Sequence, residues 1–389
     1  MTRAPATPRA VTGLSLIELM VAMVIGLILM LGVIQVFSAS QVASRLSEGA
    51  SRVQENARFA LEFLERDIRM AGHMGCVNDQ AHIVKGMGDP INHLTADPGD
   101  GSPLDFRVAI QGYEAPGTAP GEALTLGGTW EAPALEGALA NLAPAAAGGS
   151  DVLVLRYLSS EGAPVTAISL DGANSTVAVE DGSISRMTAG GVSSPSLFGI
   201  ADCAHADIFA GSVVAGLGQV LGNATDLTRY TVQPTGQTMI YRAESLVYYV
   251  GISADTGRPG LRRARADSTG SYTINEEVVE GVESLQLMYG LDATSDISPD
   301  DAPAGNITEL AIASDVSVGT DAAAAGQWLR VGQVKVGLLM ASPQPSLSAT
   351  PTSAPVTLGV EFEPAASGDG RYRGTYEVSI ALRNRLFGN

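Results

Sequence analysis

The sequence predicts an α+β protein in which a long N-terminal helix packs on a large, mostly antiparallel β-rich head. Residues 19–44 contain no charged side chain, and a helix of this length can span a bilayer. The next residues, up to Gly72, keep a helical spacing of apolar positions but carry charges on the other face. The rest of the chain is rich in glycine and proline and holds short runs of β-branched and aromatic residues.

The chain opens with a short basic segment that ends at Gly13. This segment carries Arg3 and Arg9 and no acid, and a single carboxylate, Glu18, follows five residues after the glycine. A lone glutamate at the start of a membrane-length apolar run costs about a few kcal/mol if it is unpaired in hydrocarbon. We therefore expect Glu18 to have a partner and a function.

Two simpler interpretations of this N-terminus are open. A secretory signal peptide has its small-residue cleavage site after the apolar core, and Ser38-Ala39-Ser40 offers such a site. A plain membrane anchor is the other interpretation, because a helix over residues 19–44 would be about 39 Å long at 1.5 Å per residue. Neither interpretation gives a role to Glu18.

Residues 12–23 read T-G-L-S-L-I-E-L-M-V-A-M, which resembles the class III signal of type IV pilin-like proteins. The resemblance implies that a prepilin peptidase cuts between Gly13 and Leu14 and methylates the new N-terminus. It also implies that Glu18 helps to place the subunit in a helical filament. Leu14 departs from the family, which usually has phenylalanine there, and this difference bears on methylation rather than on cleavage.

The same resemblance divides the chain into three parts. Residues 1–13 are expected to form a leader peptide. Residues 14–72 are expected to form the pilin helix, of which about residues 14–40 lie in a membrane or a filament core. Residues 73–389 are expected to form a periplasmic β-rich head.

The second half of the helix is expected to be amphipathic. No proline occurs between Leu14 and Ala71, and Gly72 follows at the position of a helix-terminating glycine. Arginine and glutamate residues occupy the polar face, with favourable i,i+4 pairing from Glu62 to Arg66 and from Glu65 to Arg69. The apolar face is formed by Val42, Leu46, Val53, Ala57, Ala60, Leu61, Leu64, Ile68 and Ala71. We expect one continuous rod whose second half packs this face onto the head.

The chain has two cysteines, Cys76 and Cys203. An even count in a protein exported from the cytoplasm favours one disulfide. Two histidines, His73 and His205, lie close to them in sequence, so that a tetrahedral zinc site is an alternative. Two free buried thiols are a third possibility.

The head is expected to consist of β-strands separated by stretches rich in proline, glycine and alanine. Candidate strands are residues 106–110, 152–157, 165–170, 176–179, 228–232, 238–242, 245–251, 260–264, 282–289, 333–340 and 372–382. Residues 241–250 read Y-R-A-E-S-L-V-Y-Y-V and are interpreted as a hairpin-forming region. Residues 73–103, 292–321 and 341–357 are interpreted as loops, with a short turn at residues 326–329.

The resemblance to the pilin-like superfamily continues beyond the N-terminus. The block A-R-F-A-L-E-F-L-E-R-D-I-R-M-A-G at residues 57–72, followed by Gly75-Cys76, resembles the end of the helix in PilW-type minor pilins of type IV pili. Residues 201–209, 279–290 and 378–385 resemble further blocks of that family. The match is scattered over most of the chain, and nothing is inferred from it for the inserts at residues 97–149 and 292–326.

The composition excludes some classes of function. The chain has 23 Lys and Arg against 41 Asp and Glu, a net charge of −18; cleavage after Gly13 would make it 21 − 41 = −20. Such an acidic chain lacks the positive surface needed to neutralise nucleic-acid phosphates. It also lacks the common nucleophile-elbow, zinc-protease, phosphate-binding and dinucleotide motifs. We therefore expect neither an enzyme nor a nucleic-acid-binding protein, and no cofactor.

The remaining polar clusters point to no chemistry of their own. Of the four histidines, His73, His82 and His93 lie in or near one loop and are expected to be solvated rather than catalytic; the fourth is His205. A calcium site is a weak alternative for two acidic loops, because neither has the EF-hand spacing. The residues concerned are Asp97, Asp100, Asp292, Asp296, Asp300 and Asp301. The basic residues Arg262, Arg263 and Arg265 are interpreted as a solvated strand edge, with docking to another pilin as an alternative.

Taken together, the motifs and the resemblance imply a minor pilin that primes assembly of a type IV pilus, near its tip. The expected partners are the major pilin, other minor pilins, the prepilin peptidase, the inner-membrane assembly platform and a tip adhesin. The precursor would be a single-pass inner-membrane protein, and the mature chain would reach a surface pilus that serves adhesion or twitching motility. The alternatives are a minor pseudopilin of a type II secretion system and an anchored periplasmic enzyme or binding protein.

Overall fold

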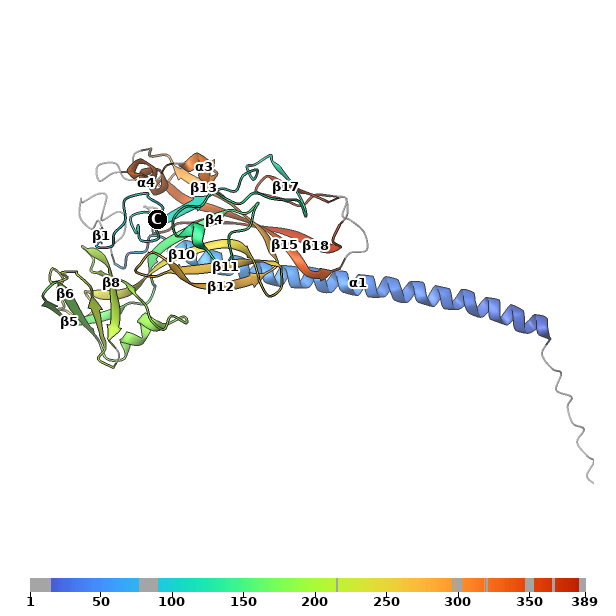
Figure 1. The fold of residues 1–389 in the computed structure, drawn as a ribbon, viewed down its shortest axis with the longest axis horizontal. Helices are drawn as coiled ribbons and strands as arrows, with labels where there is room; N and C mark the ends of the chain where they lie inside the picture. The colour runs from blue at the N-terminus through green and yellow to red at the C-terminus, as the bar shows by residue number, and fades with distance from the viewer. Residues whose placement is uncertain are drawn as a thin grey trace, which may run out of the picture.

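A long helix and a β-rich head make up the molecule (Figure 1). This computed structural model describes residues 15–76, 90–214, 216–295, 297, 303–317, 319, 321–346, 353–365 and 368–384. The C-terminal half of the helix lies along the head, and the N-terminal half projects from it. The expected α+β architecture is therefore confirmed.

Helix α1 (Leu16–Met70) is one continuous element of 55 residues, about 82 Å long at 1.5 Å per residue. Ser15 caps its N-terminus. Its C-terminal cap is Ala71, and Gly72 follows with a φ of 77°, the left-handed conformation that glycine adopts without strain. In the second half, every third or fourth residue is buried against the head: Gly49, Val53, Ala57, Ala60, Leu64, Asp67 and Ile68. The amphipathic pattern therefore predicted the packing face correctly.

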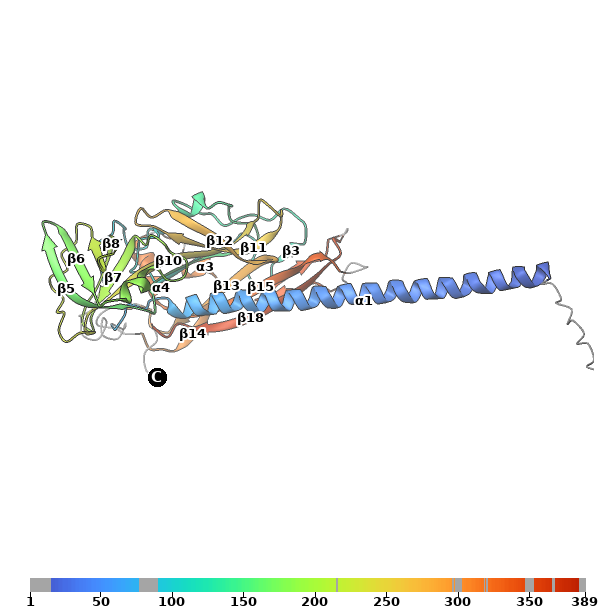
Figure 2. The same ribbon diagram turned by 90° about the horizontal axis from the view of Figure 1, so that it is seen from below.

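The head contains two antiparallel sheets that lie next to α1 (Figure 2). The order of the first is β2 (Ile110–Tyr113), β4 (Val152–Leu158), β10 (Met239–Ile252), β11 (Pro259–Ala266) and β12 (Tyr272–Glu280). The order of the second is β14 (Ile307–Ala311), β13 (Val282–Asp292), β15 (Val331–Pro345) and β18 (Arg371–Ala381). Buried residues of α1 and of both sheets form one continuous apolar core, so the helix is an integral part of the head.

A closed ring of six strands forms a second lobe, at the end of the head farthest from the projecting helix (Figure 1). Its strands are β5 (Ala163–Asp171), β6 (Asn174–Val179), β7 (Leu197–Ala201), β8 (Ala206–Val214), β9 (Gln219–Gly222) and the first part of β10. Each pairs antiparallel with the next, in the order β10-β5-β6-β9-β8-β7 and back to β10. This barrel has a core of its own, with Phe198, Phe209 and Ile240 fully buried in it. Strand β10 therefore belongs to both the barrel and the first sheet.

Small elements complete the head. A three-stranded sheet joins β3 (Ala123–Thr125), β17 (Val360–Glu363) and β16 (Val356–Thr357), and β1 (Ile91–Asn92) pairs parallel with β8. Among the described residues, short α-helices and 3₁₀ helices lie in the connections: α3 (Ala313–Val316), α4 (Ala322–Leu329), η1 (Leu139–Asn141) and η2 (Ser183–Thr188).

Some of the expected strands are present in the structure and others are not. Most runs with alternating or continuous apolar residues coincide with a strand, namely β4, β5, β6, β11, β13, β15 and β18. The hairpin expected at residues 241–250 is wrong, because these residues lie within the single strand β10. No glycine, proline or asparagine occurs between Arg242 and Val250, so the segment has no residue suited to a tight turn.

Other expectations were also wrong. Residues 228–232 form no strand, and of residues 106–110 only Ile110 is in one. Phe106 and Val108 are buried in a turn whose carbonyl groups bind the Arg156 guanidinium, including Val108 O at 2.7 Å from Nη1. The segments expected to be loops contain β1, β14, β16, α3 and the end of β15, and the turn at residues 326–329 is the end of α4. Strands β7, β8, β9 and β12 were not foreseen.

Candidate functional site

The N-terminus of α1 is stabilised by a reciprocal pair of hydrogen bonds between Ser15 and Glu18. The Ser15 backbone N–H donates to Glu18 Oε2 at 3.0 Å, and Ser15 Oγ accepts from the Ile17 N–H at 3.3 Å. This arrangement is a capping box, which satisfies N–H groups that the helix itself leaves unpaired. The structure thus shows a local role for Glu18 that the sequence analysis did not foresee. Gly13 and Leu14 lie outside the described residues, so their cleavage and methylation stay predictions.

The first half of α1 projects from the head, and residues 15–45 are all exposed in the part of the chain that the structure describes. Its large apolar side chains between Leu16 and Phe37 are each 49% to 78% exposed. An apolar surface of this size is not stable in water and must be covered by lipid or by other helices. By length and composition this is the one helix among the described residues that could cross a membrane.

The second half of α1 carries a buried acid at its contact with the first sheet. Asp67 is only 3% exposed, and its Oδ2 accepts a hydrogen bond from the Tyr248 hydroxyl at 2.5 Å. Arg263 Nη1 donates to the same oxygen at 3.1 Å. Because Tyr248 lies on β10 and Arg263 on β11, the carboxylate joins the helix to two neighbouring strands. Buried charges are stable only when they are paired and hydrogen-bonded, as here.

The surroundings of Tyr248 keep its hydroxyl group protonated. Burial, together with the charge of Asp67, raises the pKa of Tyr248 well above its usual range. The hydroxyl therefore stays protonated and donates to Asp67 at all ordinary pH values. Arg263 also binds Glu276 and lies over the ring of Phe63, with 5.8 Å between the guanidinium carbon and the ring centroid. We call Asp67, Tyr248 and Arg263 the helix clamp.

This result corrects the interpretation of the basic cluster as a solvated edge. Strand β11 is not an edge strand, because it pairs with β10 on one side and β12 on the other. The side chains of Arg262, Arg263 and Arg265 are only 13% to 14% exposed, and each is ion-paired with an acid on α1 or a neighbouring strand. Two of these ion pairs form because the arginines lie directly across from acids on the neighbouring strand: Arg262 faces Glu277 and Arg263 faces Glu276 of β12.

The two cysteines are joined to each other. Cys76 and Cys203 form a disulfide with their Cα atoms 4.6 Å apart. Cys76 follows the end of α1, and Cys203 lies in the turn between β7 and β8. The bond therefore ties the end of the helix to the barrel, and it leaves no thiolate for the zinc alternative.

The described histidines make separate contacts. His73 Nδ1 is 2.8 Å from the carbonyl oxygen of Leu158. His93 Nε2 is 3.3 Å from Asp207 Oδ2, and Arg229 binds the other oxygen of Asp207. His205 Nδ1 is 3.5 Å from Asp202 Oδ1. His73 and His205 are half-buried and His93 is exposed, so the expectation of solvated histidines holds for His93 and not for His73. His82 lies outside the described residues.

The acidic residues considered for calcium act as acceptors for backbone N–H groups where the structure describes them. Asp292 accepts from Thr294, Ala304 and Gly305. Asp100 accepts from Asp97 and Ser102, which is the turn that the sequence predicted first. Asp296, Asp300 and Asp301 lie outside the described residues.

Three structurally important acids, Asp67, Glu114 and Asp151, were missed by sequence reasoning. Asp67 was detectable, because it continues the three- and four-residue spacing of Ala60, Leu64 and Ala71 and thus falls on the apolar face. Glu114 and Asp151 form a second buried pair, bridged by the Thr118 hydroxyl at 3.1 Å from Glu114 Oε1 and 3.5 Å from Asp151 Oδ1. No local pattern indicates that this pair meets, since 37 residues separate its members.

The comparisons with known proteins agree with this architecture. Residues 247–384 match the family model described as Type IV Pilus-assembly protein W, and residues 8–34 match the Prokaryotic N-terminal methylation motif. The first match begins within β10, so most of the barrel lies outside it. No curated protein matches the chain.

Among solved structures, a type IV-like pilin from Thermus thermophilus is similar at 14% sequence identity, over 58% of this chain and 85% of that one. The TM-score is 0.22, too low to say anything further about the head. The chain is therefore similar to the PilW family of type IV pilus-assembly proteins over residues 247–384 and carries the N-terminal methylation motif at residues 8–34.

Proposed function

We propose that this protein is a minor pilin that is cleaved between Gly13 and Leu14, methylated at Leu14 and built into a type IV pilus. The precursor is held in the inner membrane by the first half of α1, with its head in the periplasm. After cleavage by the prepilin peptidase, the same half-helix enters the filament core. The main support for this proposal is the structure of helix α1, which is uninterrupted. Its first half is apolar and exposed, whereas its second half is part of the core of the head.

The size of the head supports a role in priming assembly near the tip. Residues 73–389 place 389 − 72 = 317 residues on a single helix. A head of this size, with a barrel at its far end, is easier to place at the end of a filament than along a tightly packed shaft. The partners would be the major pilin, other minor pilins and the assembly platform of the inner membrane, and a tip adhesin could bind the head.

Mass spectrometry of sheared filaments tests this proposal. We expect peptides of the chain in the filament fraction, with a methylated Leu14 as the N-terminal residue. Labelling of the head with gold-conjugated antibodies should place it at filament ends. Absence from pili, combined with loss of protein secretion when the gene is deleted, would instead indicate a type II secretion pseudopilin. A mature N-terminus near Ser40 would contradict the pilin interpretation.

A further inference from the structure

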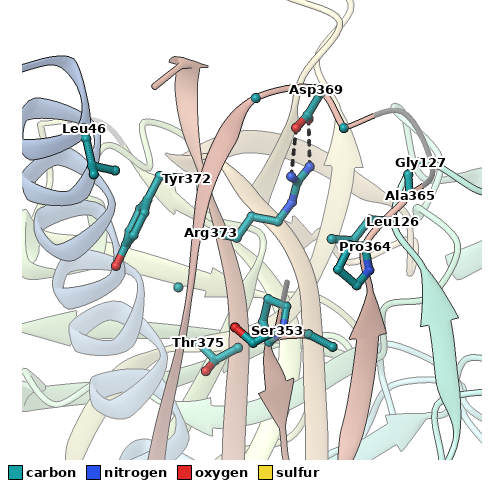
Figure 3. Close-up of a pocket in the computed structure, with 15 residues that line it drawn as sticks. Leu46, Leu126, Gly127, Ser353, Pro364, Ala365, Asp369, Tyr372, Arg373 and Thr375 are labelled. Carbon is teal, nitrogen blue, oxygen red and sulfur yellow. Dashed lines mark hydrogen bonds and ion pairs between the residues drawn. The ribbon is translucent and has the colours of Figure 1, made fainter. Parts of the chain in front are cut away.

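A groove opens in the head beside the point where α1 leaves it (Figure 3). Its volume is about 490 Å³. Leu46 of α1 and Tyr372 of β18 form one wall, Leu126 and Pro364 form the opposite wall, and Thr375 lies between them. We call this the base groove.

The base groove continues the exposed apolar surface of α1. The large apolar side chains of the helix are exposed up to Phe37 and again at Val42, and Leu46 is one turn further on. Residues 16–37 extend about 32 Å, which matches the hydrocarbon core of a bilayer, and Leu46 lies about 14 Å beyond Phe37. Lipid chains that cover residues 16–37 therefore end before they reach the groove.

The groove presents little charge to an occupant. Its one described cation, Arg373, is paired with two acids: Nη2 donates to Asp369 at 2.8 Å and Nε donates to Glu283 at 2.6 Å. The other described lining residues besides Asp369 are apolar, small or uncharged. The occupant is therefore expected to be apolar and free of charge in the part that is buried.

We infer that the base groove receives the apolar half of the N-terminal helix of a neighbouring pilin-like subunit. This inference rests on the proposed function, which brings such helices together side by side. Residues 19–44 of this chain are charge-free, and a helix of that kind fits an uncharged apolar groove. A parallel neighbour must be shifted by about 14 to 40 Å along the axis to bring its residues 19–37 level with Leu46.

Photo-cross-linking in assembled filaments tests the inference. p-Benzoylphenylalanine replaces Tyr372, whose aromatic ring it resembles, in the full-length chain in living cells. After illumination, filaments and membranes are collected separately, and cross-linked peptides are identified by mass spectrometry. We expect the partner peptide to come from the apolar N-terminal helix of a pilin-like protein. The matched control places the same residue at Leu170, which is also exposed but lies on the barrel, and should give no such peptide.

Cross-links from Tyr372 to lipid, to another protein's head or to this chain's own head would overturn the inference. The outcome is separable from that of the proposed function. A cross-link to an apolar helix in a secretion pseudopilus would support the groove but contradict the type IV pilus. If the chain is present in pili but gives no such cross-link, the type IV pilus assignment is supported and the groove inference is contradicted. If the chain is found in neither assembly, the proposed function and the groove inference are both contradicted.

Two substitutions at Thr375 give a second measurement. Thr375→Glu places a charge in the groove, and a charge that is buried against an apolar helix without a partner is strongly unfavourable. We expect roughly tenfold less of this variant in filaments, while the precursor amount and the disulfide stay at wild-type levels. Thr375→Val keeps the shape without charge and should assemble normally. Equal assembly of both variants would contradict the groove as a docking site.

Discussion

Tyr248 of β10 donates a 2.5 Å hydrogen bond to Asp67 of α1, although 181 residues separate them in sequence. The contact lies on the apolar face of the helix, where the Asp67 carboxylate would otherwise be buried in the core without a partner. Asp67 is also bound by Arg263, so the carboxylate has two donors from two strands. A clamp of this kind fixes the helix in one axial position, because an apolar stripe of alanine, valine and leucine alone allows sliding by a turn.

The first prediction concerns the helix clamp. Tyr248→Phe removes one donor from a buried carboxylate, which we expect to lower the free energy of unfolding by about 1–3 kcal/mol. Asp67→Ala should cost at least as much, because it leaves Arg263 near a low-dielectric core without that partner. Chemical unfolding of the full chain in detergent measures both. Tyr372→Phe is the control, since this tyrosine is only partly buried; an equal loss there would show that the effect is not specific to the clamp.

The second prediction concerns the disulfide. Cys76 and Cys203 should both resist alkylation under denaturing, non-reducing conditions and react after reduction. The bond closes a loop across 127 positions, which in the chain-entropy model is worth about 4–5 kcal/mol. The double variant Cys76→Ser, Cys203→Ser should therefore unfold at lower denaturant concentration. Two reactive thiols in the native oxidised protein, or bound zinc in stoichiometric amount, would contradict the pairing.

The third prediction concerns pH. Burial raises the pKa of Glu114 to about 7, against hydrogen bonds from Ala313 and Thr118 that lower it. Burial and the nearby charge of Glu114 raise the pKa of Asp151 well above its usual range. In each case the folded chain holds a proton that the unfolded chain releases. The contribution of these two acids to stability is therefore greatest at acidic pH and falls as the pH rises from about 4.5 towards 7.

Thermal unfolding of the full chain in detergent between pH 4.5 and 8 measures this effect. Allowing for solvent screening, we expect a loss on the order of 1–2 kcal/mol from Glu114. Glu114→Gln is uncharged at every pH and should flatten the profile. A profile that is equally steep in the Gln variant would assign the pH dependence to other groups.

Sequence reasoning succeeded where the signal is local. Helix α1 could be predicted because its spacing, its lack of proline and Gly72 all depend on residues close to one another. Long apolar runs such as those of β4, β13 and β15 were found for the same reason. The barrel could not be predicted, because its closure depends on β10 pairing with both β5 and β7, and β8 has no clean alternation of exposed and buried residues.

In the candidate site, too, sequence reasoning found the residues that are close together in the chain and missed those that are far apart. Gly13, Leu14 and Glu18 belong to one short motif and were readable together. The helix clamp joins residues far apart in the chain, and only the position of Asp67 on the apolar face hinted at it. The burial of Arg263 and Arg265 depends on acids across the sheet, so three nearby arginines were mistaken for a solvated edge.

The fourth prediction concerns processing. Gly13→Val should leave an uncleaved precursor in the inner membrane, because a β-branched side chain replaces the small residue at the expected cut. Immunoblotting should show one band that is larger than the mature chain, with no protein in sheared filaments. The conservative control Gly13→Ala should retain partial cleavage. Normal maturation of Gly13→Val would place the cut elsewhere.

The last prediction concerns Glu18, which has two separable roles. In the structure its carboxylate accepts the Ser15 N–H in the capping box. Cleavage at Leu14 would create a positive amine directly before Ser15, and we propose that Glu18 pairs with this amine on the same or a neighbouring subunit. A helix N-terminus favours a negative charge at this position. Without such a pair, apolar helices in a filament core would have little to fix their axial register.

Two substitutions distinguish these roles. Glu18→Gln can still accept a hydrogen bond in a capping box but has no charge, whereas Glu18→Ala loses both functions. If charge pairing directs assembly, both variants should insert into the membrane and be cleaved, and both should fail to restore surface pili in a strain lacking the gene. If only the cap matters, Glu18→Gln should restore piliation and Glu18→Ala should not. Full piliation by Glu18→Ala at native expression would show that neither the cap nor the charge at this position directs assembly.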